Sequence, residues 1–335
     1  MFHVYEADGM ELPVQMLSHR WNRNHFRTSP IKFPQHYMMH EATVSLPVSI
    51  DAMGYTTLRI KGGRQEQHER VKPEPTLVTS HRSMENDTLE VTILPQGTLR
   101  LLDKRTGEVY HDLLIYENTA DTGDGWYFGQ TIGDQAHMTG MGQASVSLVH
   151  DGPCVATFCI RQVVSLPAHF ETGDNWRRST QRVDQVIETY VTLRAGVDHV
   201  EVETVIDNVT QDHRMRVLLP TGVSDAQTFF ADAAFDVVER PIALRSDNHR
   251  YREPEVETKP QQTWTAVAGS RRGLAVISEG LHETAVRDQP DRPIALTLYR
   301  STFKTVLTDG EPDGQLRQTL RFRYWIQPLA GEINP

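Results

Sequence analysis

The residues best suited to ligand chemistry lie in one glycine-rich segment, ENTADTGDGWYFGQTIGD, at residues 117–134. The segment holds three aspartates and three consecutive aromatic residues: Asp121, Asp124, Asp134, Trp126, Tyr127 and Phe128. Sugars present apolar C–H faces and hydroxyl rims, so an aromatic plane beside carboxylates is suited to binding them. The alternative is that the aromatic residues close one end of a β-sandwich core and the aspartates make turns. The residue types support the two interpretations about equally, because functional residues concentrate on loops held by rigid sheets.

The fifteen histidines raise the question of a metal site. His36 and His40 have the i,i+4 spacing that chelates a metal from one face of a helix. However, Pro34 argues against a helix there, and two ligands fall short of the usual three or four. His199 and Glu201 would share one face of a strand, which is more typical of a solvated surface. The sequence therefore predicts no metal or other cofactor site in this chain.

Signatures of nucleophilic and phosphate chemistry are absent from the sequence. It contains no G-x-S-x-G elbow, no Walker-type phosphate loop and no dinucleotide fingerprint between a strand and a helix. The fragment GMGQAS at Gly140 leads into a strand and is expected to be a flexible connection. A catalytic nucleophile is therefore not predicted.

Composition restricts the class of protein and its partners. The 335 residues carry a formal net charge of −10 without a clustered run of lysine or arginine, which argues against nucleic-acid binding. No apolar run approaches 20 residues, and the N-terminal MFHVYEADG lacks the regions of a signal peptide, so no membrane contact is expected. Cys154 and Cys159 are spaced to point to opposite faces of a strand. They are expected to be reduced and buried, which favours a cytoplasmic location.

Strand patterns dominate the chain from end to end. Short alternating segments rich in β-branched residues occur at 42–50, 54–60, 87–94, 97–103, 144–150, 156–166, 183–193, 273–278, 294–300 and 316–326. They predict an all-β protein with a large antiparallel β-sandwich (a supersandwich), preceded by a small and incomplete β-sandwich domain. The polar, proline-bearing stretch GGRQEQHERVKPEP predicts a linker. The expected domains are 1–62, a linker at 63–76, and 77–335.

The segment DNVTQDHRMRVLLPTG, from Asp207 to Gly222, follows the alternating run VEVETVID. Together they predict two adjacent antiparallel strands around an Asx-type turn. The charged residues of the motif are expected to pair with one another at a sheet edge or turn. They are Asp212, His213, Arg214 and Arg216. The motif is thus interpreted as structural, without a direct catalytic role.

The order of several motifs resembles the C-terminal half of glycoside hydrolase family 38, the α-mannosidases and their bacterial mannosylglycerate hydrolase relatives. The segments that carry the resemblance between Leu89 and Ile326 are GTLRLLDKRTGEVY, TGDGWYF, DNVTQDHRMRVLLPTG, FDVVERP, GLAVISEGL, IALTLYRS and EPDGQLRQTLRFRYWI. Upstream, DGMELPVQ and SIDAMGYTTLRI are similar to the end strands of the family's small β-domain. The resemblance therefore covers nearly the whole chain.

The resemblance implies which residues contact a sugar. In the family, the C-terminal sandwich lends residues to the rim of the sugar pocket. One maps onto Trp126 or its neighbour Tyr127, in the loop with Asp124, and another maps onto Arg300 in IALTLYRS. The sequence departs from the bacterial loop pattern at 129–130, where Gly-Gln replaces the usual Ser-Pro. Which of the two aromatic residues faces the sugar stays open.

The resemblance also implies what lies outside this chain. The family's catalytic domain carries an H-x-D zinc pair, a zinc-binding aspartate that acts as the nucleophile, and a further zinc histidine. No H-x-D occurs in this sequence, so zinc and the carboxylates of a retaining mechanism are expected in the missing catalytic domain. The isolated chain is predicted to be inactive.

Two functions remain open at this point. The chain is either the non-catalytic C-terminal part of an α-mannosidase-like hydrolase of mannose metabolism, or a stand-alone carbohydrate-binding or scaffolding sandwich. An α-mannoside is the expected ligand in the first case. The sequence leaves open whether a separate catalytic polypeptide or a homo-oligomer is involved.

Overall fold

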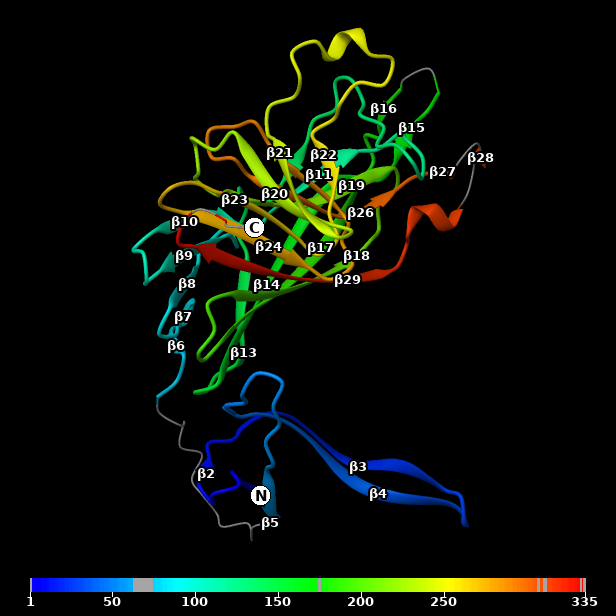
Figure 1. The fold of residues 1–335 in the computed structure, drawn as a ribbon. Helices are drawn as coiled ribbons and strands as arrows, with labels where there is room; N and C mark the ends of the chain where they lie inside the picture. Colours follow the sequence, from blue (N-terminus) through cyan, green and yellow to red (C-terminus); the bar gives the residue numbers. More distant parts are fainter. Residues whose placement is uncertain are drawn as a thin grey trace. The chain divides into compact units, whose positions relative to one another are not determined.

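The computed structural model of the protein describes residues 2–62, 75–173, 176–305, 308–309, 312–331 and 333. The chain forms two compact units, Met1–Val78 with His150–Ala156, and Thr79–Val149 with Thr157–Pro335. Regular structure in the described residues is β-strand, apart from the short 3-10 helices η1 (Asn248–Arg250) and η2 (Pro312–Gln315). The prediction of an all-β antiparallel fold is confirmed (Figure 1).

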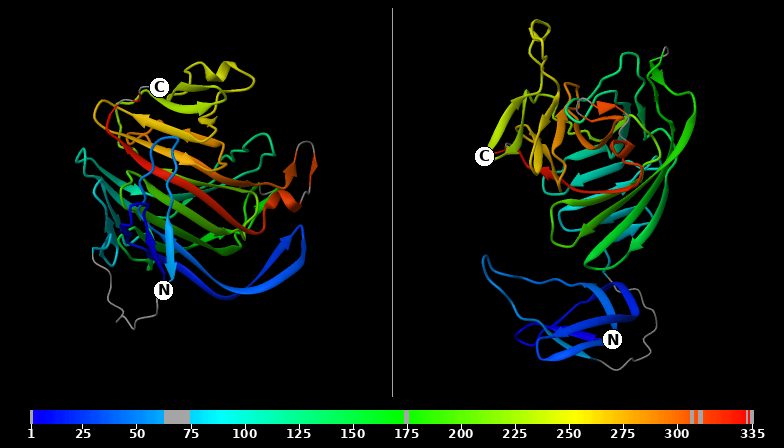
Figure 2. Two further views of the ribbon diagram at one scale, coloured as in Figure 1. Left: turned by 60° about the horizontal axis from the view of Figure 1, so that its bottom comes forward. Right: turned by 90° about the vertical axis from the view of Figure 1, so that its right-hand side faces the viewer.

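The smaller unit contains a three-stranded antiparallel sheet and a long hairpin. The sheet has the order β2 (Glu11–Leu12), β1 (Phe2–Tyr5), β5 (Arg59–Gly62), and the hairpin joins β3 (Gln15–Ser29) to β4 (Lys32–Ser45). The hairpin is the long blue ribbon of Figure 2. Most of its side chains are exposed on both faces, so its sequence lacks the alternation that marks a half-buried strand.

The larger unit contains three main sheets, of five, six and nine strands. The five-stranded sheet has the order β10 (Val109–Leu113), β9 (Leu99–Asp103), β8 (Leu89–Ile93), β7 (Ser83–Glu85), β6 (Val78–Ser80). The six-stranded sheet has the order β12 (His137–Met138), β11 (Ile115–Ala120), β19 (His213–Leu219), β26 (Ile294–Ser301), β25 (Glu283–Val286), β22 (Thr258–Pro260).

The nine-stranded sheet has the order β13 (Ser145–His150), β14 (Val155–Pro167), β17 (Arg182–Arg194), β18 (Val200–Asp207), β29 (Thr319–Leu329), β24 (Gly273–Ser278), β23 (Trp264–Ala268), β20 (Thr228–Ala233), β21 (Asp236–Pro241). Two small ribbons pair β15 (Phe170–Glu171) with β16 (Arg177–Arg178), and β27 (Lys304–Thr305) with β28 (Thr308–Asp309). Eight of the ten segments predicted as strands coincide with β8, β9, β13, β14, β17, β24, β26 and β29. The other two, 42–50 and 54–60, overlap strands only at their ends.

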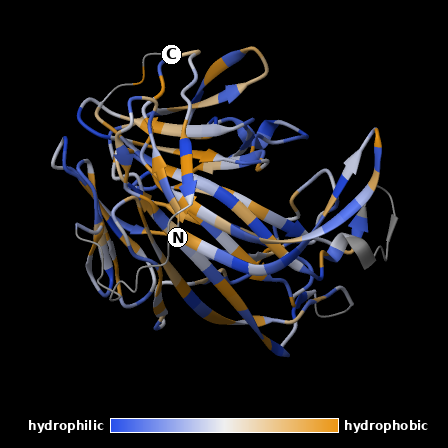
Figure 3. Ribbon diagram, turned by 90° about the horizontal axis from the view of Figure 1, so that it is seen from below, coloured by the Kyte–Doolittle hydropathy of each residue, from blue (hydrophilic) through white to orange (hydrophobic). Residues whose placement is uncertain are grey.

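Alternation along the strands builds the sandwich core. Along β18, Val200, Val202 and Ile206 are buried, whereas Glu201 and Glu203 between them are half-buried. Figure 3 shows the same alternation as orange and blue bands along many strands. Strands with this pattern therefore give one apolar face to the core and one polar face to their surroundings.

Buried tyrosines join the six-stranded and nine-stranded sheets face to face. The hydroxyl of Tyr116, on β11, forms hydrogen bonds with the hydroxyls of Thr189 (2.7 Å) on β17 and Thr204 (2.8 Å) on β18. The ring of Tyr299, on β26, stacks on Phe322 of β29 with centroids 5.8 Å apart. These contacts define the inner face of the six-stranded sheet, and the opposite face is called its outer face below.

The prediction that residues 200–219 form two adjacent antiparallel strands is wrong. β18 pairs with β17 and β29 in the nine-stranded sheet, whereas β19 pairs with β11 and β26 in the six-stranded sheet. The connection crosses from one layer to the other, with Asp212 at φ 56°. Period-two alternation identifies a strand but does not say which strand lies beside it, so the sequence could not reveal the change of sheet.

The charged residues of that motif also do not pair with one another. The Asp212 carboxylate accepts from the Gln315 side-chain amide (2.6 Å) and from the Phe170 N–H (3.2 Å). Arg214 and Arg216 lie in the interior of a six-stranded sheet rather than at its edge. The contacts of these two arginines come from other segments: Arg216 bonds Glu117 and Glu257, and Arg214 contacts Phe128 and lies 3.8 Å from Glu283.

Three further predictions concern the linker, the two cysteines and membrane crossing. The predicted linker at 63–76 lies outside the described residues except for its last two positions. Cys154 is buried, Cys159 is half-buried, and both are free thiols. None of the helical segments in the described part of the chain has the length and apolarity needed to cross a membrane.

Candidate functional site

The loop of residues 121–129 leaves β11 and is fixed to β26 by Arg300. The Arg300 guanidinium donates to both carboxylate oxygens of Asp121, from Nε to Oδ2 (2.7 Å) and from Nη2 to Oδ1 (3.2 Å). Nη2 also donates to the carbonyl oxygens of Asp124 (2.9 Å) and Tyr127 (2.5 Å). Asp121 is fully buried. A buried ion pair with these additional hydrogen bonds holds the loop in one conformation.

Asp124 shapes the turn that carries the aromatic residues. Its Oδ1 accepts hydrogen bonds from the backbone N–H groups of Trp126 (2.8 Å) and Tyr127 (2.9 Å), an Asx-type turn. The N–H groups of Tyr127 and Trp126 lower the pKa of the Asp124 carboxyl, so the turn is held by a carboxylate. The Trp126 and Tyr127 side chains are 71 % and 64 % exposed. They are therefore not core residues that close the sandwich.

Two glycines let the arms of the loop approach each other closely. A Cβ on Gly123 would lie 1.8 Å from the Tyr127 carbonyl oxygen, and a Cβ on Gly129 would lie 2.0 Å from the Gly123 nitrogen. Both residues donate their N–H to Asp121 Oδ1. Gly129 is one of the two positions at which the sequence departs from the bacterial pattern. The close approach explains why this loop accommodates only glycine there.

The aspartates of the segment are thus structural. Its aromatic residues have two different environments: Trp126 and Tyr127 are exposed, whereas the Phe128 ring lies against Arg214. Asp121 and Asp124 cap the loop, and Asp134 Oδ2 accepts from the Ala120 N–H (2.7 Å). Two adjacent aromatic side chains remain exposed at the tip of a loop fixed at its base. The structure places Asp124, Trp126 and Tyr127 in one loop, and Arg300 bonds the backbone of that loop. The Arg300 guanidinium is occupied by the loop itself, and its side chain is 17 % exposed.

A second group of charged residues lies on the outer face of the six-stranded sheet. The buried Glu117 carboxylate on β11 accepts from Arg216 Nε (2.9 Å) on β19 and from Arg287 Nη2 (2.7 and 2.5 Å), which follows β25. Arg216 also donates to Glu257 (3.0 Å). Burial raises the pKa of Glu117, but Arg216 and Arg287 outweigh burial and hold it below its usual value. Glu117, Arg216 and Arg287 are called the paired row.

The adjacent row on the same face consists of Thr119 and Arg214, which are direct cross-strand neighbours. Arg214 is buried, and its guanidinium carbon lies 3.4 Å from the centre of the Phe128 ring. Burial, and then the neighbouring Arg216, lowers the pKa of Arg214 to about 10, so it is a cation at neutral pH. Thr119 and Arg214 are called the open row.

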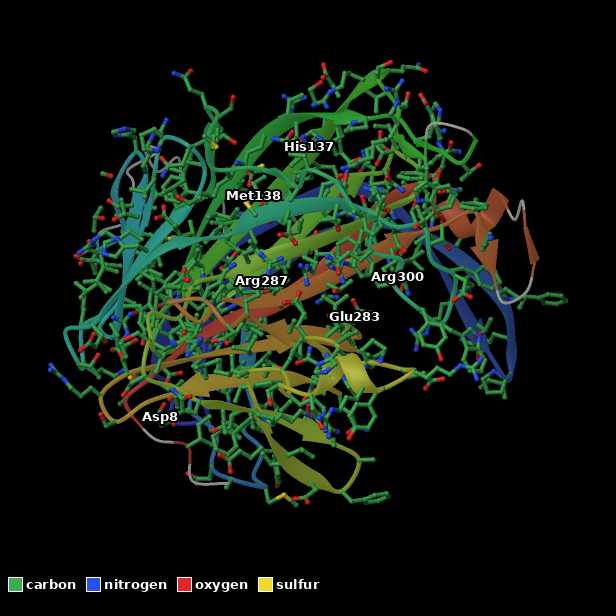
Figure 4. The ribbon with its side chains drawn as sticks, turned by 90° about the horizontal axis from the view of Figure 1, so that it is seen from above. Asp8, His137, Met138, Glu283, Arg287 and Arg300 are labelled. Carbon is green, nitrogen blue, oxygen red and sulfur yellow. The ribbon has the colours of Figure 1, made fainter. Side chains whose placement is uncertain are left out.

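Both rows line one groove. It has a volume of about 720 Å³, and Thr119, Phe128, Arg214, Arg216 and Arg287 form part of its wall. The rest of the wall comes from residues 130–136, 244–258 and 288–289. Because Phe128 directly follows Trp126 and Tyr127, the aromatic loop and the groove are continuous along the chain. Figure 4 labels three side chains of this region, Glu283, Arg287 and Arg300.

The sequence identified Arg214 and Arg216 as charged residues of one strand, but it did not indicate that they line a groove. Their i,i+2 spacing on a strand places both on one face, a signal that was present in RMR. Their neighbours in the groove wall come from positions as far apart as 119, 257 and 287, and no local pattern connects these positions.

The described residues do not provide the group of ligands that zinc requires. No cluster of three or more histidine, cysteine, aspartate or glutamate side chains suited to a metal ion occurs among them. His36 and His40 lie on strand β4. The His40 and Trp21 rings have centroids 4.6 Å apart, and His36 Nδ1 lies 3.3 Å from Asn24 Oδ1. Both histidines therefore make side-chain contacts between the two strands of the hairpin.

Comparisons with known proteins agree with this architecture. Residues 84–315 match the family described as Glycosyl hydrolases family 38 C-terminal domain. A curated Halalkalibacterium halodurans protein, provisionally named mannosylglycerate hydrolase, is 28 % identical over 250 residues, which are 71 % of this chain and 27 % of that protein.

Two solved structures from Enterococcus faecalis have the same fold. An alpha-mannosidase has a TM-score of 0.84 and 27 % identity, and the match covers 98 % of this chain and 38 % of that one. A protein in the Glycosyl Hydrolase Family 38 has a TM-score of 0.80 and 26 % identity, with 98 % and 39 % covered. The chain therefore spans between about a quarter and two fifths of the length of these relatives.

Proposed function

The chain belongs to glycosyl hydrolase family 38, and on that basis we propose that it is the non-catalytic C-terminal part of an α-mannosidase-like enzyme. In this proposal the loop of residues 121–129 binds carbohydrate and completes the sugar pocket. An α-mannoside is the expected ligand, and the protein acts in mannose metabolism in the cytoplasm. The proposal extends to this chain the activities for which its relatives are named.

The observation that carries the proposal is the exposed pair Trp126 and Tyr127 on a fixed loop. An aromatic face can pack against the C–H face of a sugar, and the Tyr127 hydroxyl can bond to a sugar hydroxyl. Because Arg300 and Asp121 already order the loop, binding does not require the loop to lose further conformational freedom. We assign Arg300 and Asp124 to positioning this pair.

Zinc and the catalytic carboxylates come, in this proposal, from a separate catalytic polypeptide or a further part of the protein. The described residues do not offer a zinc ligand set, and the loop aspartates are engaged with backbone N–H groups. We therefore expect the purified chain not to hydrolyse an aryl α-mannoside. Turnover that survives purification and is lost with a chelator would contradict this part of the proposal.

The binding test is a titration of the chain with methyl α-D-mannoside, followed by NMR or calorimetry. Trp126→Ala and Tyr127→Ala should each be compared with Trp21→Ala, which removes a tryptophan of similar exposure, 66 %, from the β3–β4 hairpin. Loss of a stacked aromatic should weaken binding roughly 3- to 10-fold. The variant with the larger effect identifies the residue that faces the sugar. Equal affinity in all three variants would remove the loop from the site.

Asp121→Asn tests whether the loop must be held in place. Asp121 is fully buried and cannot contact a ligand, so its effect on sugar binding can only be indirect. We expect weaker mannoside binding and greater mobility of the Trp126 indole in NMR relaxation. Unchanged affinity with a more mobile indole would refute the positioning role.

The alternative, a stand-alone carbohydrate-binding or scaffolding sandwich, differs in its response to a catalytic partner. If a family catalytic domain is supplied in trans, the enzyme proposal predicts activity that depends on Trp126 or Tyr127. Sugar binding without any gain in activity would favour the stand-alone function.

A further inference from the structure

The long hairpin of the smaller unit exposes its side chains over most of its length (Figure 2). Among residues 18–43, called the arm below, all side chains are exposed except those of Ser29 and Met39. β3 and β4 form a sheet of their own, and no other strand in the described part of the chain pairs with either. A two-stranded ribbon alone is marginally stable in water. The arm therefore gains stability from any surface that covers it.

Strand pairing sorts the side chains of the arm onto two faces. Cross-strand partners share a face, as Phe26 and His36 do. Positions 36, 38 and 40 of β4 alternate onto that same face. Trp21 also belongs to it, since the Trp21 and His40 rings have centroids 4.6 Å apart.

A bulge in β3 brings Trp21 to the face that carries Phe26. Between the pairs of Arg20 and Arg23, β3 advances by one residue more than β4, and Asn22 has φ 51°. Without the extra residue, Trp21 and Phe26 would point to opposite faces, because they are five positions apart. The bulge thus gathers two large aromatic side chains on one face.

The two faces differ in charge. One face, called the aromatic face, has no lysine, arginine, aspartate or glutamate in the paired segments 19–26 and 36–42. Its central members are Trp21, Asn24, Phe26, His36, Met38 and His40. The opposite face, called the basic face, carries Arg20, Arg23 and Arg27, with Glu41 across from Arg20. The aromatic face is the apolar one, and its Trp21, Phe26 and Met38 side chains are 66, 56 and 62 % exposed.

The aromatic face is complementary to itself. Packing this face on the same face of a second copy about a two-fold axis covers the apolar side chains of both and brings no like charges together. Exposed side chains of this size offer on the order of 100 Å² each. The six central members of two copies therefore bury about 1,200 Å², which is the lower bound of a specific interface.

Charge also favours a second copy. The arm has four cationic side chains and one carboxylate, a net charge of +3, whereas the whole chain carries −10, so the rest of the chain carries −13. The arm of one copy is therefore attracted to the acidic remainder of another. In the stacked pair the two basic faces lie on the outer sides, about 20 Å apart, so salt screens their mutual repulsion.

We propose that the chain self-associates through the arm, with the aromatic faces of two copies packed against each other about a two-fold axis. The interaction surface consists of the aromatic face alone, and the basic face stays in solvent. The proposal does not depend on sugar binding by the loop of residues 121–129.

The test is sedimentation velocity of the full chain over a series of protein concentrations at neutral pH. We expect the mass to rise with concentration from 38.1 kDa towards twice that value. Trp21→Ala and Phe26→Ala should each weaken self-association roughly tenfold, because truncating a packed aromatic anchor is among the most costly changes at an interface.

Tyr37→Ala is the matched control. Tyr37 is an exposed aromatic residue of the same arm, but it lies with His25 on the basic face. Its replacement should leave the self-association constant unchanged. If a variant does not fold, hydroxyl-radical footprinting of the unaltered chain carries the test: oxidation of Trp21 and Phe26 should fall as the protein concentration rises, whereas that of Tyr37 should stay constant.

Four outcomes would overturn the proposal. The first is a chain that stays monomeric at its highest soluble concentration, and the second is self-association that survives both Trp21→Ala and Phe26→Ala. The third is an equal loss in Tyr37→Ala. The fourth is protection of Trp21 by an added family catalytic domain, or by phospholipid vesicles, in a chain that remains monomeric, which would assign the aromatic face to that partner.

Variants of the arm and of the loop separate this proposal from the proposed function. Trp21→Ala should weaken self-association and leave mannoside binding unchanged, and Trp126→Ala should do the reverse. Loss of sugar binding with retained self-association leaves the arm interface standing. A monomeric chain that binds mannoside leaves the sugar loop standing.

Discussion

The outer face of the six-stranded sheet carries two adjacent rows that differ in whether their buried arginine is hydrogen-bonded to a carboxylate. In the paired row, Glu117 bonds both Arg216 and Arg287. In the open row, Arg214 lies two residues away on the same strand but has unbonded donors. The strand and its neighbours are shared, but the residues across from the two arginines differ: Arg216 faces Glu117 and Thr297, whereas Arg214 faces Thr119 and a second arginine, Arg300. The buried arginine is therefore hydrogen-bonded to a buried carboxylate in one row, whereas in the other row it keeps two donors without a partner among the described residues.

The largest expected effect comes from breaking the paired row. Arg216→Met leaves Glu117 buried with one guanidinium instead of two, so the free energy of unfolding should fall by about 3 kcal/mol. Urea denaturation measures it. The control Arg321→Met removes one partner of an exposed ion pair and should change the free energy of unfolding by less than about 1 kcal/mol. A similarly small loss in Arg216→Met would mean that the paired row does not stabilise the sheet.

The next prediction uses pH to compare the outer face with the inner face of the same strand. His213 is fully buried there and contacts the Thr210 hydroxyl (2.7 Å) and the Asn208 side chain (3.0 Å). Burial, and then Arg178, lowers its pKa to about 3. Below pH 6.5 the unfolded chain therefore binds more protons than the native state. The stability of neutral His213 is fully present above pH 6.5 and is lost as the pH falls towards 3.

Between pH 7 and pH 5 this linkage should cost about 2 kcal/mol of unfolding free energy. His213→Gln removes the titrating group, so wild type should lose about that much more than the variant over the same interval. Equal slopes would mean that His213 takes up its proton over the same pH range in the native and the unfolded state. In that case the inner face would not hold an uncharged histidine, and it could not be contrasted in this way with the charged Arg214 of the open row.

Much of the fold followed from the sequence because alternation reports burial locally. The exposed β3–β4 hairpin was missed, since neither of its faces is buried. The assignment of β18 and β19 to one sheet was wrong, because pairing is decided by contacts far apart in the chain. Composition identified the aromatic loop, but the hydrogen bonds between Arg300 and Asp121 join residues that are 179 positions apart in the sequence. The contrast between Arg214 and Arg216 was equally invisible, since it depends on whether residue 119 or 117 faces the guanidinium.

The smallest expected effect is the sharpest test of the contrast between rows. Arg214→Met removes a cation two of whose buried donors lack partners among the described residues. It loses the contact with Phe128, worth about 1 kcal/mol, and the long ion pair with the half-buried Glu283 (3.8 Å). The free energy of unfolding should therefore stay equal to that of wild type or rise by up to about 1 kcal/mol. A loss as large as that of Arg216→Met, measured by the same urea titration, would show that Arg214 stabilises the fold as much as the paired arginine does.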